Sequence, residues 1–193
     1  TAGTVTVTNA VAITGDHDQV TAALVTAGTK VEVSDATVTI NDADATAITA
    51  AELSAIGGAT IGQVTVTNAV AIEGTTAEVT AALVTAGTLV VVSDAAVTIT
   101  NTPTINELNA IAAKTTGVVT ATLAANSLAN LGALTTEATD AITITVNDAD
   151  AAALTASNLS TLGGKTAGTV TVTNAVAIEG TTAEVTAALV TAG

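Results

Sequence analysis

The sequence predicts an α/β solenoid, with a right-handed parallel β-sheet on one face and short helices on the opposite face. Three observations predict it. A block, VTVTNAVAIEGTTAEVTAALVTAG, occupies residues 64–87 and recurs unchanged at residues 170–193. Strand-like motifs of the V-x-V type return at nearly regular intervals, and a helix-start motif follows most of them. Such internal periodicity is typical of stacked repeats.

The strand motifs define about seven coils of about 26 residues, within the period of about 20 to 30 residues that is typical of solenoids. The coils are expected to begin near Val5, Val31, Val64, Val90, Val119, Ile144 and Val170. The interval from Val31 to Val64 is the longest, and it carries an extra VEVSDAT before VTINDADA. This insertion is either a longer, bent strand or an added strand.

Within a coil, alternating residues such as Val64, Thr65 and Val66 predict a half-buried strand. An Asn or Asp with a small neighbour follows and predicts a corner. A capping box then starts a short helix, as in Thr75-x-x-Glu78. Its apolar pair, Val79 and Leu83, forms one buried helix face, and Gly87 ends the unit.

Stacking is required for stability, because a coil of about 26 residues buries too few aliphatic side chains to offset about 1.5 kcal/mol of conformational entropy per residue. The core contains no Phe, Tyr, Trp, Met or Cys. We therefore expect residues 1–193 to form a single continuous solenoid segment of a longer repeat protein, with open strand edges at both ends that favour self-association, end to end or lateral.

The charge is strongly acidic, with 17 Asp and Glu residues against Lys30, Lys114 and Lys165, and a formal net charge of −14. This balance excludes a basic nucleic-acid-binding surface. No sufficiently long run of apolar residues is present, so we expect no membrane insertion.

Two acidic corners are the candidate calcium sites, since clustered oxygens suit Ca²⁺. Their residues are Asn41, Asp42, Asp44, Asn147, Asp148 and Asp150. The alternative for both is a corner combined with a helix cap. His17, the single histidine, lies between Asp16 and Asp18 and is expected to be a solvated loop residue, with assistance to a bound cation as the other interpretation. No other cofactor is expected.

Outward-facing threonines in Thr-x-Thr pairs are the remaining surface feature. Stacked on a flat sheet they would form a regular surface array of the kind found on ice-binding solenoids, although Thr also simply suits exposed strand positions. The array residues are Thr6, Thr8, Thr65, Thr67, Thr98, Thr100, Thr171 and Thr173. An ice- or polysaccharide-binding face is therefore the alternative function.

Catalysis is not expected. Cysteine is absent, the single histidine has no serine near it in sequence, and Gly57-Gly58 and Gly163-Gly164 follow helices instead of opening them as phosphate-binding loops do. The paired carboxylates fall at repeated positions, which favours an architectural role.

The combination of VTV-[TS]-[ND]-A strands with Thr-x-x-Glu helices resembles the repeat regions of giant secreted or cell-surface proteins of bacteria, cyanobacteria included. The resemblance covers the whole chain, and it lies in the type of strand and helix motif and in the length of the repeat. It implies an extracellular or cell-surface structural protein that contributes to a filament, a surface layer or an adhesin stalk.

Overall fold

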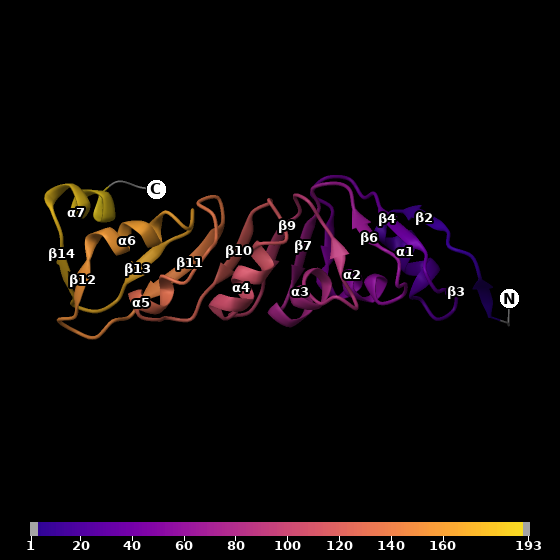
Figure 1. The fold of residues 1–193 in the computed structure, drawn as a ribbon, viewed down its shortest axis with the longest axis horizontal. Helices are drawn as coiled ribbons and strands as arrows, with labels where there is room; N and C mark the ends of the chain where they lie inside the picture. Colours follow the sequence, from indigo (N-terminus) through magenta and orange to yellow (C-terminus); the bar gives the residue numbers. More distant parts are fainter. Residues whose placement is uncertain (1–3, 191–193) are drawn as a thin grey trace. The chain divides into compact units, whose positions relative to one another are not determined.

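The computed structural model describes residues 4–190, which divide into two compact units. The first contains residues 4–100 and 110–118, and the second contains residues 101–109 and 119–190. Parallel strands alternate with short helices in both (Figure 1). The predicted α/β solenoid architecture is thereby confirmed, while the single continuous segment 1–193 stays a prediction.

Within residues 4–100, the first unit contains nine strands and three complete helices. They are β1 (Val5–Val7), β2 (Ala12–Gly15), α1 (His17–Leu24), β3 (Val31–Val33), β4 (Thr37–Ile40), β5 (Ala47–Thr49), α2 (Ala50–Gly57), β6 (Val64–Val66), β7 (Ala71–Gly74), α3 (Thr76–Leu83), β8 (Val90–Val91) and β9 (Ala96–Ile99). Helix α4 (Ile105–Ala112) contains residues of both units.

In the second unit, strands and short helices also alternate along residues 119–190. They are β10 (Val119–Thr122), α5 (Leu128–Leu131), β11 (Ala141–Val146), β12 (Ala153–Thr155), α6 (Ala156–Gly163), β13 (Val170–Val172), β14 (Ala177–Glu179) and α7 (Thr182–Leu189).

Strand register confirms the predicted repeat. In the first unit β2, β4, β6 and β8 form one parallel ladder, where Val38 pairs with Val64 and Val64 with Val90. A second ladder joins β5, β7 and β9, and pairs Ile72 with Val97. In the second unit Ile144 pairs with Val170. Each of these partners lies one coil further along the chain, so equivalent side chains stack.

Most coils contain two strands, and the prediction of one strand per coil was wrong. In the third coil the corner at Asn68 and Ala69 separates β6 from β7, and α3 begins directly after β7. The second strand has only four residues, of which Ile72 is buried. A segment that short is not long enough to display a period of two, so the pattern was missed.

The long interval between Val31 and Val64 contains an added strand, which resolves the two alternatives. Strand β3 pairs with β1, whereas β4 pairs with β2 and β6. The coil expected at Val31 therefore places β3 in a separate two-stranded sheet with β1, while β4 connects β2 to β6 in the ladder that β8 continues.

The core lies between the two strand ladders and the helices. In the third coil Val64, Ile72, Val79 and Leu83 are each at most 1% exposed. The predicted helical pairs are buried in α1 to α4 and α6, but not in α7, where Leu189 is 58% exposed. A buried Val or Leu contributes about 1.5–3 kcal/mol, so coils with several such residues stabilise one another strongly.

The predicted capping boxes are present. The pairs are Asp16 and Gln19, Thr49 and Glu52, Thr75 and Glu78, Thr104 and Glu107, and Thr181 and Glu184. The Thr49 hydroxyl donates to Glu52 at 2.7 Å, and hydrogen bonds from Thr49 hold the pKa of Glu52 below its ordinary value. None of the helices among residues 4–190 has the length and apolar character of a membrane span.

Candidate functional site

The acidic corner after β4 joins three successive coils. Asp42, at 7% exposure, accepts a hydrogen bond from the His17 backbone N–H at 2.8 Å, at the start of α1. The Asn68 side-chain amide, from the third coil, donates to the Asp42 backbone carbonyl. Asp42 therefore receives polar contacts from the coil before it and the coil after it.

Asp44 and Ala45 complete this corner. The Asp44 carboxylate accepts from the Ala69 backbone N–H at 3.1 Å. The Ala45 N–H donates to the Ala69 carbonyl at 2.8 Å, and Ala45 has φ of 60°. A left-handed alanine costs of order 1 kcal/mol, so the surrounding bonds must hold it in place.

The corner after β11 repeats this geometry in the second unit. Asp148 accepts from the Leu128 N–H of α5 at 2.7 Å, and its carbonyl accepts from the Asn174 amide. Asp150 accepts from the Ala175 N–H at 3.2 Å, and Ala151 has φ of 61°. Both corners cap a helix of the preceding coil and attach the following coil.

Each aspartate of the calcium candidates therefore accepts a hydrogen bond from a backbone N–H of a neighbouring coil. Asn41 and Asn147 lie at the same corners with exposed side chains, and their backbone N–H groups donate to the preceding coil at 3.0 Å. Among residues 4–190, no group of three or more His, Asp and Glu side chains is placed to hold a metal ion. The corner-and-cap alternative describes the observed geometry, and calcium binding stays a prediction.

His17 is the first residue of α1, and its prediction as a solvated loop residue was wrong. Its side chain is 15% exposed, and Nδ1 lies 2.7 Å from Asp42 Oδ1. Nε2 lies 3.7 Å from Asp18. Burial lowers the pKa of His17, but the hydrogen bond and charge of Asp42, with the charges of Asp18 and Glu52, outweigh burial and raise the pKa above 6.5.

The predicted threonine array is divided among several ladders. Thr65 pairs with Thr39 and Thr171 with Thr145, which gives short rows of threonine. Elsewhere the rows are interrupted, because Thr6 pairs with Glu32, Thr65 with Val91 on its other side, and Thr98 with Glu73. Thr67 and Thr173 donate their hydroxyls to the carbonyls of Ile40 and Val146, both at 3.3 Å, while Thr8 follows β1 and Thr100 follows β9.

A second coil-to-coil device, the Thr-x-Gly bracket, was not recognised from the sequence. It consists of Thr60 with Gly62, Thr115 with Gly117, and Thr166 with Gly168. Each threonine hydroxyl donates to a backbone carbonyl of an earlier segment, at 2.7 Å to Ala36, 2.6 Å to Ala95 and 2.8 Å to Ile142. Each glycine N–H then donates to the same hydroxyl, at 3.0 Å in the first two brackets and 2.8 Å in the third.

The glycines of the bracket allow the backbone to approach a carbonyl oxygen of an earlier segment. A Cβ at Gly62 or Gly168 would collide with the carbonyl oxygen of Ala36 or Ile142. The sequence contains a pattern that predicts the bracket, because Thr-x-Gly recurs with its glycine two residues before a coil's first valine. The same motif at Thr1 to Gly3 lies outside the described residues.

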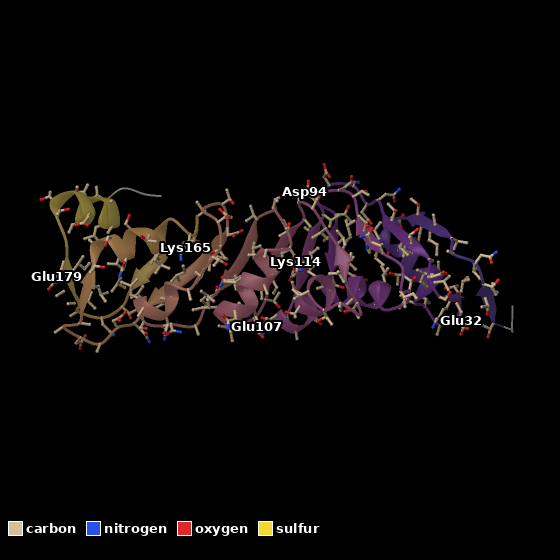
Figure 2. The ribbon with its side chains drawn as sticks, viewed as in Figure 1. Glu32, Asp94, Glu107, Lys114, Lys165 and Glu179 are labelled. Carbon is tan, nitrogen blue, oxygen red and sulfur yellow. The ribbon has the colours of Figure 1, made fainter. Side chains whose placement is uncertain are left out.

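Lys165, one of the three lysines, is labelled in Figure 2. Lys165 donates from Nζ to the carbonyls of Gly132 and Leu134, at 2.8 and 2.5 Å, so this cation ties one coil to another within the second unit. A shallow groove of about 510 Å³ crosses the outer face of β5, β7 and β9, and its carboxylates are Glu73 and Glu78. Glu78 is already engaged by Thr75 at 2.8 Å.

No protein-family model, curated protein or solved structure matches the chain. Its function is therefore inferred from the coils themselves.

Proposed function

We propose that this chain is a structural repeat module that acts outside the cell, in a filament, a surface layer or an adhesin stalk. The observation that supports this proposal best is the constant register of the strands. Val38, Val64 and Val90 pair in succession along one ladder, so each coil offers its neighbour the same strand edge and the same aliphatic positions.

The polar residues also support an architectural role. Asp42, Asp44, Asp148 and Asp150 bond backbone groups of neighbouring coils, and the bracket threonines do the same. Residues that recur with the period and hold one coil to the next are the residues that a structural repeat requires.

Ice or polysaccharide binding is less well supported. A lattice-matching face needs uninterrupted rows, and Glu32 and Val91 stand beside Thr6 and Thr65. We therefore prefer the structural role.

Immunogold electron microscopy of intact and sectioned source cells, with antibodies raised against residues 4–190, tests this function. We expect gold particles on thin fibres or on the cell surface, and pre-immune serum is the control. Label confined to the cell interior would contradict the proposal.

A further inference from the structure

Residues 64–87 and 170–193 have the same sequence, but their described parts have different surroundings. Leu83 is 0% exposed, whereas its counterpart Leu189 is 58% exposed. The helices are otherwise alike, with N-cap φ and ψ of −69° and 161° at Thr75 and −68° and 160° at Thr181. The difference in burial therefore comes from neighbours and not from the coil's own conformation.

Strands β8 and β9 cover the first of these copies. Val90 pairs with Val64, and Val97 pairs with Ile72. The N–H groups of Ala96 and Thr100 donate to the carbonyls of Val70 and Gly74, both at 2.9 Å. Within residues 4–190, β13 and β14 pair on one side alone, with β11 and β12.

The less buried counterparts in the second copy define a surface that we call the open coil face. Its residues are Val170, Val172, Ile178, Val185 and Leu189. The first four are half-buried, whereas the residues equivalent to them at 64–87 are buried.

The covering segment has a recognisable sequence. The copy at residues 64–87 is followed by TLVVVSDAAVTI at residues 88–99, and the similar coil at residues 5–28 is followed by TKVEVSDATVTI at residues 29–40. In both, the first strand pairs with the first strand of the preceding coil, β8 with β6 and β3 with β1. Both also carry a Ser–Asp corner, in which Ser93 donates to Asp94 at 2.8 Å and Ser34 to Asp35 at 3.0 Å.

We propose that the open coil face binds a coil of the T-x-V-x-V-S-D-A-x-V-T-I type, in the register that β8 and β9 adopt on β6 and β7. The inference rests on the proposed stacking role and names the partner for it. Strand addition supplies the main-chain bonds, and the inward valines supply specificity. The first coil of a second copy is the other occupant to consider, but no described junction places one coil of the 64–87 type directly on another.

Hydrogen exchange of the full chain tests this proposal. The probe is a synthetic peptide of residues 88–118, and the readout is amide exchange over residues 177–190 by mass spectrometry. Because residues 71–84 would give digestion products of the same mass, Thr186→Ser marks the second copy. Its hydroxyl can retain the bond that Thr186 donates to the Thr182 carbonyl. The matched control peptide carries Val90→Asp and Val97→Asp.

We expect the wild-type peptide to slow exchange at residues 177–190 by about tenfold or more, toward the rate at residues 71–84, and the control peptide to leave it unchanged. A chain with residues 88–118 repeated after Gly193 gives a measurement that does not depend on peptide solubility. Slowed exchange in either format supports the proposal.

Unchanged exchange in the extended chain would overturn it, and so would equal protection by the control peptide. Protection that rises with the concentration of the chain alone would identify a second copy as the occupant and would also overturn it. None of these outcomes depends on where the protein is located, so failure here and failure of the immunogold test are distinguishable.

Discussion

The Asp42 carboxylate contacts both the backbone and the imidazole of His17, at 2.8 and 2.7 Å, although the two residues lie 25 positions apart. At the equivalent corner Asp148 binds the backbone of Leu128, whose side chain cannot titrate. The first junction therefore adds a histidine–carboxylate pair to a cap that the second junction forms without one.

Stability at the first junction should depend on pH. Because the folded-state pKa of His17 is raised, its contribution is complete below about pH 6.5, the unfolded value, and is lost as the pH rises through the folded value. We expect faster amide exchange over α1, corrected for intrinsic rates, as the pH rises from about 6 to about 8. His17→Leu, which copies Leu128, is the control and should remove this dependence. An equal pH dependence in the variant would contradict the assignment.

Loss of the Asp148 cap should destabilise the second unit. Asp148→Ala removes the acceptor of the Leu128 N–H, and we expect a loss of about 1–2 kcal/mol in the free energy of unfolding, measured by urea denaturation. Glu179→Ala, at an exposed side chain of the same unit, should change it by less than about 0.5 kcal/mol. A similar effect of both substitutions would argue against the cap.

The glycine of the Thr-x-Gly bracket should not tolerate a side chain. Gly168→Ala places a Cβ against the Ile142 carbonyl, so we expect a loss of about 2 kcal/mol or more in thermal or urea unfolding. Gly163→Ala is the matched control, since a Cβ there meets nothing within 4 Å. The control should be neutral or stabilising by up to about 1 kcal/mol, because alanine favours the helix. Equal stability of the two variants would exclude the close approach.

The two identical copies allow a direct comparison of burial. Leu83→Ala should cost about 2–5 kcal/mol, because it leaves a cavity at a fully buried site. Leu189→Ala, in the same sequence context at 58% exposure, should cost less than about 1 kcal/mol. Urea denaturation of both variants measures the difference. Similar losses would mean that Leu189 is covered in solution.

The parallel ladders could be predicted because Val64 and Val90 belong to motifs that repeat with visible alternation. The helix starts were equally readable, since Thr75 and Glu78 form a local pattern. The second strand escaped detection because β7 is short and buries a single isoleucine. The partner of His17 escaped for another reason: Asp42 approaches it only after the coils stack, and no local pattern records that contact.

The acidic corners show the same limit of prediction from local sequence patterns. Asp42 and Asp44 were recognised as a cluster of oxygens, and their composition alone fits either a cation or a cap. Their bonds to His17 and Ala69 come from the preceding and following coils, so the choice between those uses required three coils in place.

The recurrence of one sequence block at residues 64–87 and 170–193 also bears on how the chain reaches its native arrangement. Nothing inside either stretch distinguishes one from the other, so only flanking segments, such as residues 88–99 after the first copy, direct each to its place. During refolding, exchange between the two positions is the natural error, as in other arrays of near-identical repeats. Differences between the neighbouring segments therefore keep each copy of the repeat from folding into the position of the other.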